Sequence, residues 1–454
     1  MFQKVLIANR GEIAVRIIRA CNDLGLQTVA IYSTADRNSL HVLHANEAVC
    51  VGPPRSADSY LKVPHILSAC QVTGAEAVHP GYGFLSEDHH FARMCEENGL
   101  HFIGPSSDTI QQLGGKVAAK ALAKQVGCPT IPGSEGFVTT EKEAFSEAKK
   151  IGYPLMIKAS AGGGGKGIRI VESERELASH FHGVRHEAEN LFGDSGVYME
   201  KQILMPRHVE VQVLADKQGK TLHLGERDCT IQRRRQKLIE ESPSPILTSE
   251  VREKMGKAAV DLVAAAGYYS AGTVEFLVDS DNHFYFMEVN TRIQVEHTVT
   301  EERTGIDLVR EQIRIARGEP LGYSQQSIQS QGHVFQFRIN AEDPSNQFLP
   351  SPGPLDYYTP SGGPHVRVDS ACYHGYVVPP YYDSLIAKLI VKGKDREEAI
   401  YIARRALREF HIGGVTSTIP FHEHILEHPQ FISSEYDLDF IDKMGLQECV
   451  FKAR

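Results

Sequence analysis

The sequence predicts a multidomain protein that joins an α/β domain to α+β domains. The chain of 454 residues is too long for one ordinary hydrophobic core. Its first 115 residues alternate short apolar strands with helical stretches, which predicts a doubly wound parallel sheet. From about residue 204 onward, alternating strands and hairpins predict a mixed or antiparallel sheet.

The N-terminal region, 1–115, has five predicted strands separated by helices. The strands are expected at Val5–Ala8, Val29–Tyr32, Ala48–Val51, Ala77–His79 and Phe102–Ile103. Asn9-Arg10-Gly11 closes the first strand and opens a helix, as at the start of a dinucleotide-binding domain. The full G-x-G-x-x-G fingerprint is absent, so NAD binding is not expected.

The second region, 116–330, contains a predicted mobile lid at 131–203. Turn residues Pro129, Pro132 and Gly133 precede a helix, a strand at 155–158, a glycine run and another helix. Four later strands are predicted at His208–Leu214, Thr273–Val278, Phe284–Val289 and Val334–Ile339. The last of them opens a third region, 331–447, and the stretches 324–332 and 350–364 are expected to be surface loops.

Composition excludes several functional classes. The net charge of −9 disfavours an extended nucleic-acid surface, and no apolar run approaches the roughly 18 residues of a membrane span. The N-terminus has no cleavage-site pattern, so we expect the mature chain to begin there. Eight scattered cysteines without a C-x-x-C pair predict reduced thiols in the cytoplasm.

The segment 284–297, FYFMEVNTRIQVEH, carries polar side chains at every second position. They are Glu288, Asn290, Arg292, Gln294 and Glu296. In an extended chain these residues share one face, while the apolar residues between them face a core. The alternative is the ordinary solvated face of an antiparallel strand.

Glu275 on the preceding strand favours a functional face. If Val278 pairs with His283, Glu275 lies diagonal to Glu288 on the same face. Two unneutralised carboxylates repel each other, whereas Mg²⁺ or Mn²⁺ satisfies both. The hairpin therefore predicts an oxygen-ligand metal site, provided that the register inferred from the turn is right.

The segment 158–167, KASAGGGGKG, is the second strong signal. Its glycines let backbone N–H groups approach phosphate oxygens, and its lysines add positive charge. The Walker pattern fails because Ile168 and Arg169 stand where Lys and Ser or Thr are required. A flexible linker is the alternative, although a lid that closes over ATP also needs flexibility.

Other candidates are weaker alone. Lys116 follows a Gly-Gly turn and could be an ordinary surface lysine, and Glu200 and Lys201 could border an adenine or be surface charge. The basic run from Gln232 to Lys237 is either a solvated face or a local anion site. Arg338 lies on the polar face of a strand.

Taken together, these segments resemble the biotin carboxylases of the ATP-grasp superfamily. The resemblance covers essentially the whole chain and includes ANRGEIAVRIIRA, HPGYGFLSE, GGGGKG, PRHVEVQVLAD, MEVNTRIQVEHTVTE, RINAEDP and PPYYDSLIAKL. Among ATP-grasp enzymes, EVNTRIQVEH with RINAEDP is typical of biotin-dependent carboxylases. It implies an N-terminal pre-ATP-grasp domain, an ATP-grasp lid and core, and a biotin carboxylase C-terminal domain.

The resemblance also implies a role for individual residues. Those implied to bind ATP are Lys116, Lys158, Gly162, Gly163, Gly164, Gly165, Glu200, Lys201, Ile203, His208, Gln232 and Leu277. Those implied to hold two metal ions are Glu275, Glu288 and Asn290. Those implied to bind bicarbonate or biotin, or to act in catalysis, are Tyr82, Lys237, Arg292, Gln294, Val295 through its backbone, Glu296 and Arg338.

Two positions depart from the family pattern. Arg235 replaces a histidine that is common in the Q-R-R-x-Q-K segment, and Ala161 replaces the first of the usual five glycines. Neither is a predicted metal ligand or acid-base residue. A nucleotide contact from residue 235 is in doubt.

The resemblance implies carboxylation of biotin with ATP and bicarbonate through carboxyphosphate. Glu296 is the expected base and Arg338 the expected partner of the biotin oxygen. Expected partners are a separate biotin carboxyl carrier protein, carboxyltransferase subunits and a second copy in a homodimer, with acetyl-CoA favoured over another acyl-CoA or pyruvate as final acceptor. Another ATP-grasp ligase, or a catalytically silent ATP-binding scaffold, remains an alternative.

Overall fold

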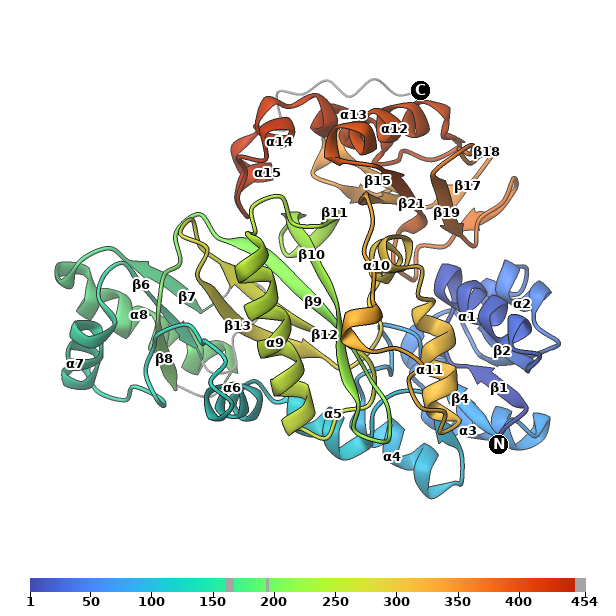
Figure 1. Ribbon diagram of the computed structural model, residues 1–454, viewed down its shortest axis with the longest axis horizontal. Helices are drawn as coiled ribbons and strands as arrows, with labels where there is room; N and C mark the ends of the chain where they lie inside the picture. Colours follow the sequence, from blue (N-terminus) through green and yellow to red (C-terminus); the bar gives the residue numbers. More distant parts are fainter. Residues whose placement is uncertain (160–166, 193–195, 446–454) are drawn as a thin grey trace. The chain divides into compact units, whose positions relative to one another are not determined.

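The computed structural model describes residues 1–159, 167–192 and 196–445 (Figure 1). The chain divides into two compact units, which are considered separately. One unit comprises 1–128, 207–276 and 288–454, and the other comprises 129–206 and 277–287. The predicted lid, 131–203, lies within the smaller unit.

The N-terminal part of the larger unit is a five-stranded parallel sheet, as the sequence predicted. Its order is β3-β2-β1-β4-β5. The strands are β1 Lys4–Ile7, β2 Gln27–Ser33, β3 Glu47–Gly52, β4 Ala77–His79 and β5 His101–Phe102. The helices are α1 Gly11–Asp23, α2 Leu40–His44, α3 Val63–Thr73, α4 His89–Glu97, α5 Ser107–Gly114 and α6 Lys116–Gln125.

Alternation along β1 shows that both faces of this sheet are covered. Val5 and Ile7 pack in a core with residues of α1, whereas Leu6 packs in a second core with residues of α3 and α4. Side chains point to opposite faces at successive strand positions, so a strand buried on both sides is apolar throughout.

The smaller unit has a three-stranded antiparallel sheet of order β7-β6-β8. Its strands are β6 Leu155–Ala159, β7 Ile168–Val171 and β8 Val197–Lys201, and its helices are α7 Glu141–Ile151 and α8 Glu174–Phe192. Both helices pack against the sheet through one apolar core. Thr140 begins α7 with a capping box to Glu143, which satisfies N–H groups at the helix start.

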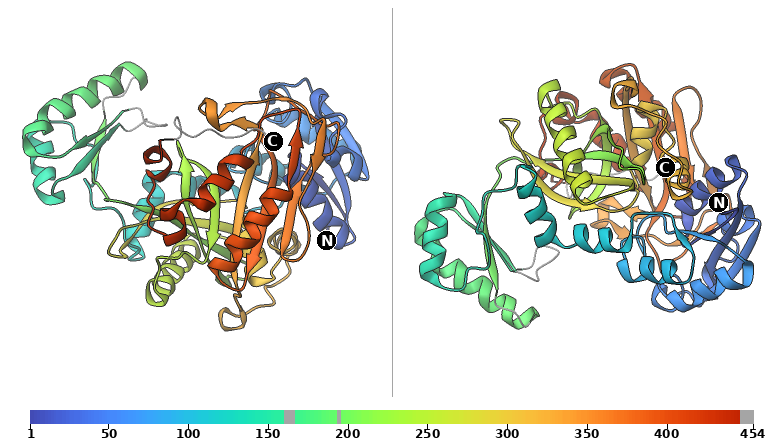
Figure 2. Two further views of the ribbon diagram at one scale, coloured as in Figure 1. Left: turned by 90° about the horizontal axis from the view of Figure 1, so that it is seen from above. Right: turned by 60° about the horizontal axis from the view of Figure 1, so that its bottom comes forward.

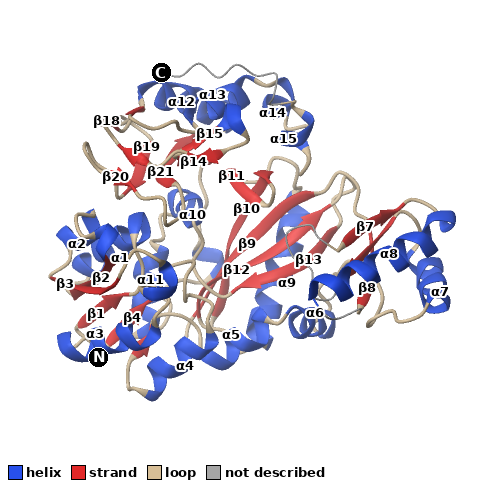
Figure 3. Cartoon of the chain, turned by 180° about the vertical axis from the view of Figure 1, so that it is seen from behind, coloured by secondary structure: helices blue, strands red, loops and turns tan. Residues whose placement is uncertain are grey.

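A large sheet of eight strands has the order β13-β12-β9-β10-β11-β14-β21-β19 (Figure 3). Its strands are β9 Arg207–Ala215, β10 Thr221–Arg233, β11 Gln236–Ser242, β12 Ser270–Val278, β13 Phe284–Asn290, β14 His333–Asn340, β19 Val366–Ser370 and β21 Leu385–Gly393. The pairs from β9 through β19 are antiparallel, as predicted for this part of the chain.

Helices cover this sheet at several places. The helix α9 Ser249–Ala265 packs on β9 and β10, and α10 His297–Thr304 and α11 Leu308–Ala316 follow β13. At the C-terminal end, α12 Arg396–Glu409 and α13 Ile419–Glu427 pack beside β14 and β21 around one large core (Figure 2). The remaining elements are β15 Glu342–Asp343, β16 Leu349–Pro350, β17 Gly353–Pro354, β18 Tyr357–Thr359, β20 Val377–Val378, β22 His411–Gly413, α14 Pro429–Ser433 and α15 Phe440–Lys443.

Two expectations from composition can be compared with the described residues. No helix among them is both long enough and apolar enough to cross a membrane. The seven cysteines within the described ranges are all free thiols. Gly162 to Gly165 lie outside the described residues.

Candidate active site

Lys237 lies at the centre of a buried charge cluster on the large sheet. Its Nζ contacts oxygens of Glu210 at 2.6 Å, Glu275 at 2.9 Å and Glu296 at 2.7 Å. Burial alone would lower the pKa of Lys237, but the three carboxylates raise it well above its ordinary value. The cluster therefore contains a permanently charged ammonium group.

Glu296 is held by two cations, one on each carboxylate oxygen. Its Oε1 accepts from Lys237, and its Oε2 accepts from Arg338 Nη2 at 2.9 Å. Burial acts to raise the pKa of Glu296, but Lys237, Arg338 and Arg227 together lower it. A carboxylate that is only 2% exposed thus remains ionised and can accept a proton from a bound acid.

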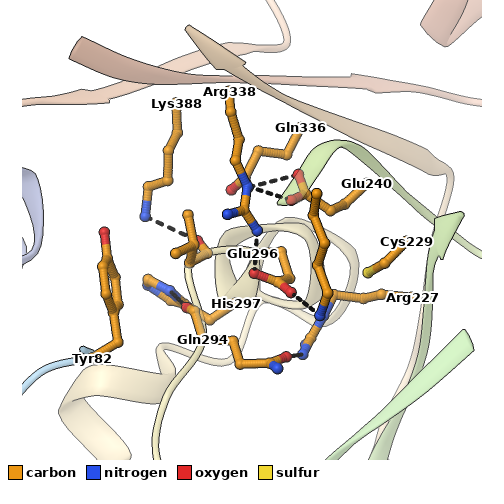
Figure 4. Close-up of polar contacts among 12 residues, drawn as sticks. Tyr82, Arg227, Cys229, Glu240, Gln294, Glu296, His297, Gln336, Arg338 and Lys388 are labelled. Carbon is orange, nitrogen blue, oxygen red and sulfur yellow. Dashed lines mark hydrogen bonds and ion pairs between the residues drawn. The ribbon is translucent and has the colours of Figure 1, made fainter. Parts of the chain in front are cut away.

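Arg338 projects from β14 between two carboxylates (Figure 4). Its Nε donates to Glu240 Oε1 at 2.6 Å, while its Nη2 donates to Glu296. Its side chain is 14% exposed, whereas Glu240 is fully buried. Arg338 is therefore more accessible to an incoming ligand than the two carboxylates that it bonds.

Arg227 is fully buried and donates hydrogen bonds to residues of the cluster. Its guanidinium donates to Glu210 at 2.6 Å and to Gln294 at 3.0 Å, with further bonds to the side chains of Gln212, Thr273 and Thr300. The strand register places Arg227 directly opposite Glu210 on β9. These bonds fix the Gln294 side chain whose amide nitrogen donates to Glu275 at 2.8 Å.

Three family models match the chain in succession. The N-terminal domain of biotin carboxylase matches residues 1–110, the ATP-binding domain of the carbamoyl-phosphate synthase L chain matches 115–324, and the biotin carboxylase C-terminal domain matches 336–443. The chain belongs to the biotin carboxylase family. This family consists of ATP-dependent ligases, so the protein is an enzyme.

Relatives agree along the full length. Biotin carboxylase 1 of Bacillus subtilis (strain 168) is 56% identical over 97% of this chain and 98% of its own. The biotin carboxylase domain of a thermophilic 2-oxoglutarate carboxylase, solved with bicarbonate, has a TM-score of 0.95 and 47% identity, covering 99% and 100% of the two chains. The same domain from Hydrogenobacter thermophilus, solved as a dimer with MgADP, ADP and bicarbonate, has a TM-score of 0.90 and 48% identity, covering 99% of each chain.

The predicted polar row is brought together, although by a different backbone path. The strand β13 ends at Asn290, and residues 291–296 belong to no helix or strand before α10 begins at His297. The expectation of a continuous extended strand to Glu296 is therefore wrong. Asn290 and Gln294 nevertheless both donate to Glu275 Oε1, at 3.0 and 2.8 Å.

The hairpin register was also wrong by one residue at its closed end. The N–H of Asp279 donates to the carbonyl of His283 at 2.9 Å, so Asp279 rather than Val278 pairs with His283. Asn282 has a positive φ of 62°, in the left-handed region of backbone conformation. This conformation allows the turn to pair Asp279, one residue after Val278, with His283.

The predicted metal ligands fit a divalent cation by their chemistry. Burial raises the pKa of Glu288, and the negative charge of Glu275 raises it further. Among the described residues, no hydrogen bond or ion pair joins the Glu288 carboxylate to a partner. Glu288 and Glu275, with the Asn290 amide oxygen nearby in sequence, form the donor set that Mg²⁺ or Mn²⁺ favours. Their role as ligands stays a prediction.

The structure also gathers a second acidic group that the sequence did not predict. His208, Glu210 and Glu275 each offer an atom within 4.8 Å of the others. His208 Nε2 lies 3.1 Å from Glu275 Oε2, and Gln232 donates to His208 Nδ1 at 3.2 Å. Thus His208, predicted as a nucleotide-binding residue, lies beside the predicted metal ligand Glu275, and Gln232, also predicted to bind nucleotide, contacts His208.

Arg292, Val295 and Tyr82 lie at the edge of the cluster. Arg292 donates to Glu87 at 2.8 Å and to Asn290 at 2.9 Å. The Val295 carbonyl accepts from Lys388 Nζ at 3.1 Å. The Tyr82 hydroxyl donates to Glu12, so the loop of Tyr82 and the backbone of Val295 are linked through the buried pair of Glu12 and Lys388.

The predicted nucleotide-binding residues of the smaller unit are placed as follows. Lys158 Nζ lies 2.6 Å from Glu200 Oε2, so an ammonium and a carboxylate neutralise each other across β6 and β8. Lys201 donates to the carbonyls of Gly152 at 3.3 Å and Tyr153 at 2.8 Å. Ile203 and Leu277 are half-buried.

Two further predicted positions lie in the larger unit. Lys116 is the first residue of α6 and is exposed, so its ammonium is available to a ligand. Arg235 occupies the β10–β11 turn with a φ of 67° and is exposed. Nothing in the structure explains why arginine replaces histidine at this position.

Sequence reasoning missed Glu210, Arg227, Glu240 and Lys388. All four are charged residues inside strands that are otherwise buried, and a fully buried charge requires a partner. That rule could have identified them as a group. It could not have paired Arg227 with Glu210, because the pairing follows from the register of β9 and β10.

Proposed function

We propose that the enzyme carboxylates biotin on a biotin carboxyl carrier protein, using ATP and bicarbonate. The observation that carries this proposal is the Glu296 carboxylate, which is held between Lys237 and Arg338 and kept ionised by them. A buried base between two cations suits an anionic acid such as bicarbonate. The relatives solved with bicarbonate and with MgADP support the same substrates.

We propose that ATP is bound by residues that the family pattern identifies. They are Lys116, His208 and Gln232 in the larger unit, and Lys158, Gly162 to Gly165, Glu200, Lys201, Ile203 and Leu277 in the smaller unit. Glu275, Glu288 and Asn290 would hold two Mg²⁺ or Mn²⁺ ions, which neutralise charge on the triphosphate. The lid at 131–203 would move to exclude water from this chemistry.

In the first step, Glu296 removes the proton of bicarbonate. The resulting dianion attacks the γ-phosphorus, the bond to ADP breaks, and carboxyphosphate forms. Lys237 and Arg292 stabilise the negative charge, Gln294 and the Val295 backbone orient the bicarbonate, and the nearby carboxylates keep Lys237 protonated. Positioning and charge stabilisation supply most of the rate in phosphoryl transfer.

In the second step, carboxyphosphate splits into CO₂ and phosphate. The phosphate takes the N1 proton of biotin, and Arg338 stabilises the negative charge that develops on the ureido oxygen. N1 then attacks CO₂ to give carboxybiotin. Arginine suits this role because its guanidinium stays charged at any working pH, and Tyr82 would border the biotin ring.

Free biotin provides the deciding experiment. The purified chain should release ADP only when bicarbonate is present, and should transfer labelled bicarbonate to biotin. ATP hydrolysis without any carboxybiotin, but stimulated by another acceptor, would favour a different ATP-grasp ligase. Binding of ATP without bicarbonate-dependent hydrolysis would favour a silent scaffold.

The final acceptor and the assembly are proposed at the level of the family. We propose a cytoplasmic homodimer that works with a carrier protein and carboxyltransferase subunits in an acetyl-CoA carboxylase for fatty acid synthesis, with the domains 1–115, 116–330 and 331–447. A related domain from a 2-oxoglutarate carboxylase favours testing other acceptors as well. Co-purification of the carrier, followed by assays with acetyl-CoA, other acyl-CoAs, pyruvate and 2-oxoglutarate, would decide among them.

A further inference from the structure

Arg338 belongs to a ring of five side chains, which is closed by four hydrogen bonds and by the backbone between Glu296 and Thr298; Figure 4 shows the part of the ring around Arg338. Arg338 joins Glu296 to Glu240, and Glu240 Oε2 accepts from Gln336 Nε2 at 2.9 Å. Thr298 then donates to Gln336 Oε1. Thr298 lies on α10 two residues after Glu296, so the ring closes on the helix that begins beside the proposed base.

Arg338 uses a different nitrogen for each of its two carboxylates. Nε donates to Glu240 and Nη2 donates to Glu296. No hydrogen bond links its third nitrogen, Nη1, to another of the described residues. One edge of the guanidinium is therefore tethered to Glu240 independently of the bond to Glu296.

The two carboxylates differ in their surroundings. Glu296 is held by Lys237 and Arg338, whereas the cation bonded to Glu240 is Arg338, and its other donor is the neutral amide of Gln336. Burial raises the pKa of Glu240, Arg338 opposes that rise, and the charge of Glu296 adds to it. If either carboxylate, Glu296 or Glu240, loses its charge, the strength with which the other carboxylate holds the Arg338 guanidinium therefore changes.

We propose that Glu240 is a positioning residue that keeps Arg338 in place after Glu296 has taken its proton. The inference rests on the proposed function and extends it. Protonation of Glu296 removes the negative charge that held Nη2. The bond from Nε to Glu240 remains, so Arg338 stays in the site while Nη2 becomes free to donate to the ureido oxygen of biotin.

Without Glu240 the freed side chain has no anchor. An arginine side chain has several rotatable bonds, and its ordering carries an entropic cost that a single charge-assisted bond can offset. Glu240 would thus keep Arg338 in the site when the first step, proton transfer to Glu296, releases Nη2. Nη2 is then available as a hydrogen-bond donor for the second step, the carboxylation of biotin. The loss of Glu240 should affect transfer to biotin more than carboxyphosphate formation.

The test is Glu240→Gln, assayed for bicarbonate-dependent ADP release and for carboxybiotin. The variant keeps the shape of the side chain but loses its charge. We expect the carboxybiotin formed per ADP to fall about tenfold, because the bond from Arg338 Nε then runs to a neutral amide instead of a charged carboxylate. The KM for biotin should rise, while the KM values for ATP and bicarbonate should stay within about twofold.

Glu241→Gln is the matched control, because Glu241 is the next residue on β11 and is equally buried. Its carboxylate bonds to Arg396, His333 and Tyr436 rather than to the Arg338 ring. This variant should lose stability but keep the wild-type ratio of carboxybiotin to ADP. An equal fall of that ratio in both variants would overturn the proposal.

Glu240→Asp covers the case in which the glutamine variant does not fold. Aspartate keeps the negative charge, but its side chain is shorter by one methylene group, so the carboxylate lies farther from Arg338. The ratio of carboxybiotin to ADP should therefore fall by a smaller factor than in Glu240→Gln. Equal losses of ADP release and carboxybiotin in either variant would overturn the positioning role. So would failure of both variants to fold, which would assign Glu240 to folding. Absence of carboxybiotin from the wild-type enzyme would instead contradict the proposed function itself.

Discussion

Lys388 Nζ lies 3.1 Å from Glu12 Oε1, in an ion pair whose lysine side chain is completely excluded from solvent. The pair joins α1 to β21, and Lys388 also donates to the Val295 carbonyl beside the proposed base. Glu12 also accepts a hydrogen bond from the Tyr82 hydroxyl. One buried cation therefore holds two segments of the candidate active site.

Replacing Lys388 by methionine should destabilise the enzyme strongly. The change leaves Glu12 buried without its cation, and breaking a buried pair in this way costs about 3–5 kcal/mol. Urea denaturation would measure the loss. The double variant Lys388→Met with Glu12→Gln should recover part of it, because no charge is then left unpaired.

Lys443→Met provides the comparison for a solvent-exposed pair. Lys443 contacts Asp437 at 2.6 Å, but its side chain is 59% exposed. Exposed pairs contribute little to stability, so the free energy of unfolding of this variant, measured by urea denaturation, should be close to that of the wild type. If Lys388→Met behaved like Lys443→Met, the buried pair would not hold the site as argued.

Glu296→Gln should abolish bicarbonate-dependent ADP release while leaving ATP affinity nearly unchanged. The amide oxygen can still accept from one of the two cations, Lys237 or Arg338, but the amide cannot take a proton from bicarbonate. General-base groups typically contribute about 10² to 10⁴ in rate, so a loss of at least a hundredfold is expected. Steady-state ADP release and an ATP-binding titration would measure both quantities. Full activity in the variant would remove Glu296 from the base role.

The Glu241 carboxylate should make the free energy of unfolding depend on pH in the acidic range. Burial acts to raise its pKa, but Arg396 and His333 hold the pKa well below the ordinary value of 4.5. A carboxyl with a depressed pKa stabilises the fold above its unfolded pKa and loses that contribution as the pH falls toward the folded value. Below pH 4.5 the loss should approach about 1.4 kcal/mol for each pH unit.

Urea denaturation of wild type and Glu241→Gln from pH 7 downward would show this effect. The gap in stability between the two proteins should be constant near neutral pH and should narrow below about pH 4.5. Exposed Glu250→Gln supplies a control in which much less narrowing is expected, because solvent screens its exposed pair with Lys254. A gap that stayed constant down to pH 3.5 would contradict the assignment.

The Mg²⁺ requirement should shift when Glu288 is replaced by glutamine. Glu288 is a half-buried acid whose pKa is raised by burial and by Glu275, and a divalent cation would relieve the repulsion. The variant should need more Mg²⁺ for half-maximal ADP release, with little change in stability in the absence of metal. An unchanged Mg²⁺ titration would exclude Glu288 as a ligand.

The elements and the chemistry could be predicted from the sequence to different degrees. Strands such as β1 and β14 were found because apolar runs and alternation are local signals. The row from Glu288 to Glu296 is recognisable from its spacing, although the strand ends at Asn290 and an irregular segment carries the remaining residues of the row. The periodicity of two could not reveal this, because an irregular path can bring the same side chains together.

Contacts between side chains that are far apart in the sequence could not be predicted from it. Arg338 meets Glu240 because β11 and β14 are neighbours in the sheet, and these residues are 98 positions apart. Local propensity carries no information about which strands pair or in what register. The positioning network was therefore invisible until the sheet order was known, whereas the residues proposed to contact substrates could be named from motifs.

Arg338→Ala should separate the two chemical steps. Removal of the guanidinium leaves Glu296 with Lys237 as its remaining bonded cation, so slow bicarbonate-dependent ATP cleavage should persist while carboxybiotin formation is lost. The measurement is labelled carboxybiotin against ADP released under single-turnover conditions. Arg338→Lys keeps one positive charge but cannot bond Glu240 and Glu296 through separate fixed nitrogens, and should restore ATP cleavage more than transfer. Carboxybiotin formation at the normal rate in Arg338→Ala would show that another group stabilises the ureido oxygen, and would remove the purpose assigned to the Glu240 tether.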